Sequence, residues 1–157
     1  MQGAYPDVSF ALLFTSQNEP FMRNKEFPFF TNLFILAAIW NLVGAGFGYF
    51  NTQYTFQGLF GRELVDPLFY EIYKGAWGTT LMFFVGYLLV AYNPIKHTGV
   101  ALIGGIGKLS FAIAELQLYY SGLANSKILF IVIGDFIFCA FFLYYFIKLV
   151  VAKKAII

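Results

Sequence analysis

Four long apolar segments dominate the pattern of hydrophobic and polar positions along the chain. They cover about residues 27–50, 74–92, 98–120 and 126–151. Each is close to the ~20 residues that a helix needs to cross ~30 Å of hydrocarbon. Since unpaired backbone groups are costly in lipid, the segments are expected to be helices. The pattern predicts an all-α membrane protein, with a four-transmembrane-helix bundle over residues 27–157.

The connections between these segments carry turn and capping residues. Asn93-Pro94 ends the second segment, and Ser126 is a good N-cap for the fourth. Asp66-Pro67 is typical of a helix start, which allows the second helix to begin before residue 74.

Between the first and second segments, the spacing of apolar residues predicts a short interfacial helix. Four of them share one helical face: Phe56, Leu59, Phe60 and Leu64. Residues 1–26 are more polar and are interpreted as an N-terminal extension, either a loop or a segment on the bilayer surface.

Composition supports the membrane assignment. Of 157 residues, 60% are hydrophobic and 11% charged, against ~45–50% and ~25% in a typical soluble domain. A soluble protein of this length could not hide so much apolar surface in one core. The single cysteine, Cys139, excludes an internal disulfide. The basic residues are scattered, so they do not indicate nucleic acid as a partner.

The distribution of Lys and Arg predicts that both termini are cytoplasmic. Six basic residues fall on the side of the termini: Arg23, Lys25, Lys96, Lys148, Lys153 and Lys154. Three fall on the opposite side: Arg62, Lys74 and Lys127.

Three ionisable residues inside predicted spans are the candidate site: Lys108, Glu115 and Asp135. A charge at mid-membrane costs at least ~2.5–3.5 kcal/mol, so it normally faces the bundle interior and has a partner. The third and fourth helices must be antiparallel neighbours because their connection is short. We therefore expect a Lys108–Asp135 ion pair with Glu115 above it.

Polar residues of the other two spans, Asn41 and Thr80 (or Thr79), lie at a similar depth. All four helices would thus contribute to one polar layer. The layer has three interpretations: a structural charge pair that fixes helix register, a ligand-binding cavity open toward the outer leaflet, or a pathway for protons or ions.

Small residues at helical spacing predict close helix contacts. Gly44 and Gly48 form a GxxxG match, and Ala101 with Gly105 repeats the spacing. We interpret both mainly as packing within the bundle, with contact to a partner as the alternative. The lone histidine, His97, lies in a predicted turn and has no second histidine for a metal site.

Short motifs shared with one group of membrane proteins extend over roughly residues 30–147. They are Trp77-Gly78-Thr79-Thr80, Gly86-Tyr87, Asn93-Pro94-x-Lys96-His97, Gly107-Lys108-Leu109 and Gly134-Asp135. With them the chain resembles small bacterial four-helix membrane proteins of the DoxX-like group, mostly uncharacterised. The resemblance implies a bacterial inner-membrane location and, if the group shares a polar site, the positions Asn41, Lys108 and Asp135.

Some DoxX-type proteins are membrane subunits associated with quinone-linked redox enzymes. The cysteines of their redox-active relatives are absent here, so the resemblance implies no redox chemistry for this chain.

The sequence favours a non-enzymatic membrane protein that binds an apolar or amphipathic small molecule, such as a quinone or a lipid, at the polar layer. Membrane lipids are then partners, and the sequence does not identify a cofactor. The alternative is an accessory subunit of a larger membrane complex or a homo-oligomer, docked through glycine faces and residues 1–26. An enzyme is the least favoured class, since no catalytic motif is present.

Overall fold

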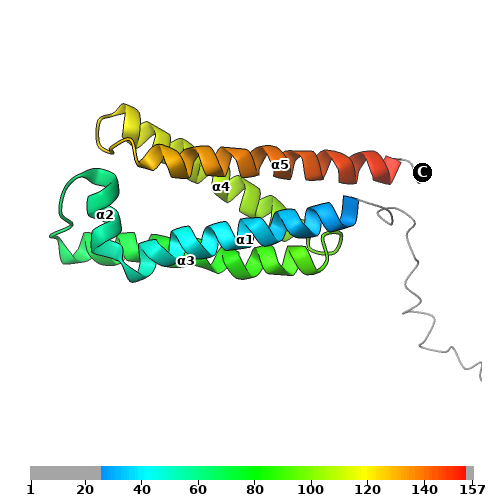
Figure 1. Ribbon diagram of the computed structural model, residues 1–157, viewed down its shortest axis with the longest axis horizontal. Coiled ribbons are helices and arrows are strands. Elements are labelled where there is room, and N and C mark those ends of the chain that lie inside the picture. Colours follow the sequence, from blue (N-terminus) through cyan, green and yellow to red (C-terminus); the bar gives the residue numbers. More distant parts are fainter. Residues whose placement is uncertain (1–25, 155–157) are drawn as a thin grey trace, which may run out of the picture.

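The protein is a bundle of helices that confirms the predicted fold class. The structure, a computed structural model, describes residues 26–154, and side chains from 27 to 149; the predicted extension over residues 1–26 falls almost wholly outside these residues. The helices are α1 (Glu26–Phe50), α2 (Thr52–Phe60), α3 (Pro67–Tyr92), α4 (Thr98–Tyr120) and α5 (Ile128–Lys154) (Figure 1). All but α2 are long and apolar enough to cross a membrane.

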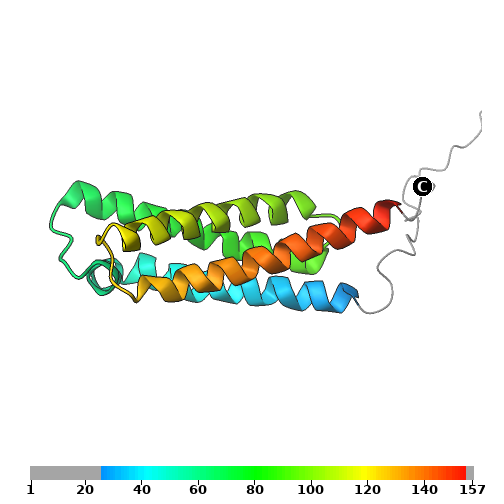
Figure 2. The same ribbon diagram turned by 90° about the horizontal axis from the view of Figure 1, so that it is seen from above.

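The four long helices form two antiparallel pairs, α1 with α3 and α4 with α5. The pairs lie one above the other in Figure 1 and contact each other less extensively, through α3 with α4 and α1 with α5. Both described chain ends lie beside the 93–97 turn, and α2 lies at the opposite end (Figures 1 and 2). The predicted antiparallel contact between the last two helices is confirmed.

Two helix starts differ from the simplest sequence boundaries. The Asp66 carboxylate accepts hydrogen bonds from the backbone N–H groups of Leu68 and Phe69, so α3 begins at Pro67. The fourth span begins at Ile128 rather than at Ser126, because Asn125 Oδ1 takes the first free N–H group, that of Lys127. The Asp66 cap could be predicted from the sequence. The use of the Asn125 side chain in place of Ser126 at the start of α5 depends on the conformation of the α4–α5 connection.

The short helix α2 is present where the apolar spacing predicts it. It ends at Gly61, whose φ of 67° is in the left-handed region that favours glycine. Asn125, in the α4–α5 connection, donates to the last carbonyls of α2: its N–H to Leu59 O at 2.8 Å and its Nδ2 to Gly58 O at 2.6 Å. These bonds fasten α2 to the other helix pair.

Aromatic rings fill the core at the end of the bundle that carries the described chain ends. Phe34 stacks on Phe142 with ring centroids 4.9 Å apart, and the Tyr145 ring meets Phe30 at 5.1 Å. Their side chains are fully or almost fully buried. We call this part, from the polar layer to the chain ends, the closed half.

Helix glycines make room for rings from facing helices. A Cβ at Gly134 would overlap the Trp40 indole, and one at Gly48 would overlap the Trp77 indole. One at Gly104 would lie 2.6 Å from Cε1 of Tyr87. The predicted packing role is therefore confirmed for Gly48, although the group packed against it is an aromatic ring. At Gly44 a Cβ would meet no atom within 4 Å, so this glycine is not needed for close packing.

Candidate functional site

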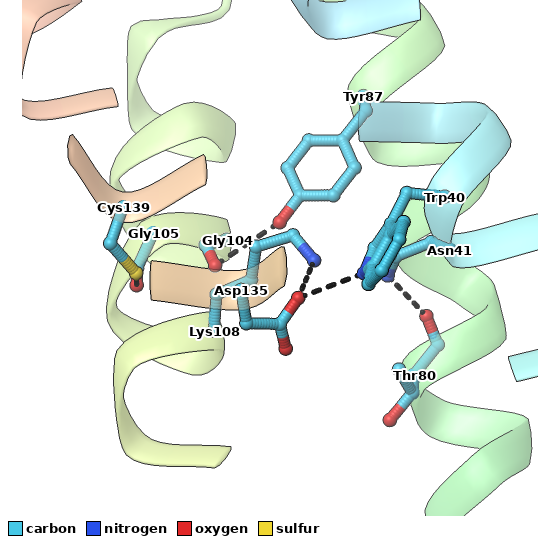
Figure 3. A network of polar contacts seen from close by, with 9 residues as sticks. All are labelled: Trp40, Asn41, Thr80, Tyr87, Gly104, Gly105, Lys108, Asp135 and Cys139. Carbon is cyan, nitrogen blue, oxygen red and sulfur yellow. Dashed lines mark hydrogen bonds and ion pairs between the residues drawn. The ribbon is translucent and has the colours of Figure 1, made fainter. Parts of the chain in front are cut away.

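The centre of the site is the predicted ion pair between α4 and α5. Lys108 Nζ lies 2.6 Å from Asp135 Oδ1, and both side chains are more than nine-tenths buried (Figure 3). Trp40 of α1 donates its indole N–H to the same oxygen at 3.0 Å. Asp135 thus receives one charged and one neutral donor, as a buried carboxylate requires.

Aromatic faces surround the ammonium group. Lys108 Nζ lies 5.2 Å from the centroid of the Phe138 ring and 5.8 Å from that of Tyr87. At these distances the rings attract a cation. The lysine is therefore stabilised in its charged form by a carboxylate and two rings.

Asn41 and Thr80 extend the layer to the α1–α3 pair. Asn41 Nδ2 donates to the backbone carbonyl of Thr80 at 3.0 Å (Figure 3). The Thr80 hydroxyl donates to Ala76 O within its own helix. Asn41 is 5% exposed. The structure therefore brings together four of the five predicted site residues, one from each long helix.

Two acceptors of this layer remain free. Within the described part of the chain, neither Asp135 Oδ2 nor Asn41 Oδ1 receives a hydrogen bond, and neither atom is fully buried. The Lys108 ammonium, which has three N–H groups, uses one on Asp135. The site can therefore both accept and donate hydrogen bonds to an additional group.

Two adjoining cavities reach these free groups. The first, of about 110 Å³, lies between all four long helices; the second, of about 140 Å³, lies toward the α3–α4 side. Five residues line both: Asn41, Thr80, Lys108, Phe111 and Asp135. The rest of each wall is mainly apolar, which is the composition expected of a site for a small ligand.

Glu115 does not join the layer. It is two turns from Lys108, lines neither cavity, and its Oε2 is buried without a hydrogen-bond partner among the described residues. The Tyr73 hydroxyl and the Trp77 indole N–H likewise are buried and make no well-formed hydrogen bond within residues 26–154.

The sequence interpretation missed Trp40 and Tyr87 as members of the site. Trp40 directly precedes Asn41, and its indole reaches Asp135 because Gly134 leaves room for it. Tyr87 donates its hydroxyl to Gly104 O at 3.1 Å and lines the second cavity. A tryptophan in mid-span beside a polar residue was the available signal, since an indole N–H in lipid needs an acceptor.

The remaining chemistry near the layer is sparse. Cys139 Sγ lies 3.8 Å from Gly105 O, the length of a weak sulfur hydrogen bond. Across the residues that the structure describes, no three His, Cys, Asp or Glu side chains gather as metal ligands would.

Comparison with protein-family models, curated proteins and solved structures finds no match for the chain. The resemblance to the DoxX-like group therefore stays an expectation from short motifs. Function has to be argued from the geometry of the site.

Proposed function

We propose that this is a non-enzymatic integral membrane protein that binds an apolar or amphipathic small molecule, such as a quinone or a lipid, at the Lys108–Asp135 layer. The observation that carries the proposal is the pair of free acceptors, Asp135 Oδ2 and Asn41 Oδ1, on residues that line two cavities with mainly apolar walls. A polar head would bond to the layer while an apolar body lies against the rings.

A purely structural ion pair would favour a different arrangement. Charges kept only to fix helix register are best served when every oxygen and N–H is bonded and the helices close around them. Here the carboxylate bonds through one oxygen, and space remains on both sides of it. A hydrogen-bond acceptor without a partner, next to an open cavity, therefore supports the binding of a ligand.

For its location, we place the bundle in a bacterial inner membrane with both termini cytoplasmic. The described ends of α1 and α5 lie on the side of the 93–97 turn, whereas α2, the start of α3 and the α4–α5 connection lie on the opposite side (Figure 1). Lys96 belongs to that turn; Arg62 precedes α3, Lys74 lies two turns into it, and Lys127 precedes α5. Arg23 and Lys25, which support the orientation, lie outside the described residues. Labelling Lys96→Cys and Lys127→Cys from outside intact cells, in a Cys139→Ala background, tests it: only the second should react.

The test of binding is native mass spectrometry of the full chain, extracted gently from its own membrane. We expect a bound small molecule of defined mass that is lost in Asp135→Asn. Glu115→Gln is the matched control, because it makes the same carboxyl-to-amide change in a neighbouring helix outside both cavities. It should keep the ligand.

Two results would contradict the proposal. Loss of the molecule from both variants would mean that binding does not depend on this layer. Co-purification with larger subunits in fixed ratio, and no small molecule, would favour the alternative of an accessory subunit.

A further inference from the structure

A groove on the outside of the bundle leads to the first cavity. It has a volume of about 320 Å³ and lies between α1, α2 and the start of α5. Groove and cavity share five lining residues: Val43, Gly44, Trp77, Phe130 and Ile131. The two spaces therefore adjoin, and the groove connects the first cavity to the outside of the bundle beside α2, where Lys127 also lines it.

Gly44 is at this junction. A Cβ built on it would meet no atom within 4 Å, so its lack of a side chain leaves the passage open. At the rim, Val43 is 61% and Phe130 72% exposed. An apolar chain lying in the groove would replace lipid contacts of these side chains with its own.

The charges of the layer limit the head group that can follow such a chain. The Lys108–Asp135 pair is already neutral as a unit, and its free acceptors are the carboxylate Oδ2 and the Asn41 amide oxygen. A phosphate or carboxylate head would be desolvated beside Asp135, and an ammonium head beside Lys108. A hydroxyl head can donate to Oδ2 and accept from Nζ with no net charge buried.

Size agrees with a small head. The first cavity holds about 110 Å³, and an apolar cavity of ~150 Å³ in another protein admits a benzene ring. The first cavity is smaller than that, so it has room for one hydroxyl group at the end of a chain but not for a glycerophosphate head with two acyl chains.

We propose that the ligand is a single-chain amphiphile with an uncharged, hydroxyl-bearing head, which binds with its head on Asp135 and Lys108 and its chain through the Gly44 junction into the groove beneath α2. This inference rests on the proposed function and adds the ligand class and the route.

The first experiment compares head groups on one chain length. The full-length protein is placed in phosphatidylcholine nanodiscs with hexadecanol, hexadecyl sulfate or hexadecyltrimethylammonium, and bound probe is counted by native mass spectrometry. We expect hexadecanol to bind at least ~10-fold more tightly than either charged probe, a difference of ~1.4 kcal/mol. A hydroquinone with a decyl chain distinguishes a ring head from a simple alcohol.

The second experiment closes the junction. Gly44→Leu should weaken binding of the preferred uncharged probe at least ~10-fold. Gly46→Leu is its matched control: a Cβ there also meets no atom within 4 Å, but Gly46 lines neither the cavity nor the groove. Val43→Trp, an exposed position on the same rim, repeats the test if Gly44→Leu fails to fold. Gly107→Leu narrows the second cavity instead and tests it as the alternative route.

The outcomes separate this inference from the proposed function. Tighter binding of a charged probe, or loss of binding in Gly107→Leu with retention in Gly44→Leu, would overturn the ligand class or the route while leaving the site in place. Failure of every probe, together with no ligand lost from Asp135→Asn, would overturn the proposed function itself.

Discussion

The two halves of the bundle differ in the hydrogen bonding of their buried polar side chains. In the closed half, the buried hydroxyls of Tyr87 and Tyr145 donate to the carbonyls of Gly104 and Pro94. In the half toward α2, which we call the open half, Tyr73 OH, Trp77 Nε1 and Glu115 Oε2 are buried and make no well-formed hydrogen bond in residues 26–154. Among the described residues, the fully buried side-chain polar atoms that lack a well-formed hydrogen bond therefore all lie in the open half.

The buried aromatic core follows the same division, but the hollows of the surface do not. The core cluster belongs mainly to the closed half, whereas the three unpaired atoms lie toward α2. Open grooves of about 520 and 360 Å³ lie over the closed half as well, the first between α1 and α5 and the second between α4 and α5. The two halves therefore differ in core packing and in the bonding of buried polar groups, with the Lys108–Asp135 pair as the boundary.

Removal of the Lys108–Asp135 ion pair should have the largest effect on stability. Lys108→Met leaves the Asp135 carboxylate buried without a cation, and we expect the free energy of unfolding to fall by ~3–5 kcal/mol. The measurement is SDS titration in mixed micelles, followed by circular dichroism.

The double variant Lys108→Met/Asp135→Leu is the control. An apolar pair of similar size should recover most of the lost stability, since a buried ion pair seldom stabilises more than apolar packing does. A loss below ~1 kcal/mol in Lys108→Met alone would contradict the view that the pair is desolvated.

The sequence was sufficient to predict the parts of the fold that depend on helix length and on the free-energy cost of placing a charge in lipid. Spans of ~20 apolar residues predict helices, and an expensive charge in a span predicts a partner, so the bundle and the Lys108–Asp135 pair were predictable. The pairing of α4 with α5 followed from their short connection. The pairing of α1 with α3 was not predictable, because helices that are apolar on all sides have no apolar stripe that indicates their neighbours.

Glu115 shows the limit for the site. Residues seven apart share a face but are separated by ~10 Å along the helix axis. Glu115 accordingly lines neither of the cavities beside the Lys108–Asp135 pair. Trp40 shows the converse: its bond to Asp135 depends on the space at Gly134, which belongs to another helix. Such complementarity between helices cannot be read from either segment alone.

A substitution next to the ion pair should have an effect of intermediate size on stability. Gly134→Ala adds a methyl group where the Trp40 indole lies, and overpacking of this kind costs ~1–3 kcal/mol. The indole should move and lose Asp135, which shifts Trp40 fluorescence in a Trp77→Phe background. Gly75→Ala, where a Cβ meets no atom within 4 Å, should shift neither fluorescence nor stability by a comparable amount.

The smallest and most direct test compares one hydroxyl from each half. Tyr87→Phe removes a hydrogen bond to Gly104 O, and such bonds in membrane proteins contribute ~0.6 kcal/mol on average. Tyr73→Phe removes a hydroxyl that makes no well-formed hydrogen bond in the described residues, so the free energy of unfolding should stay the same or rise. Both variants are compared with the unaltered chain in one SDS titration. If Tyr73→Phe loses as much stability as Tyr87→Phe, the hydroxyls are equally satisfied, and the distinction between a bonded half and an unbonded one does not hold.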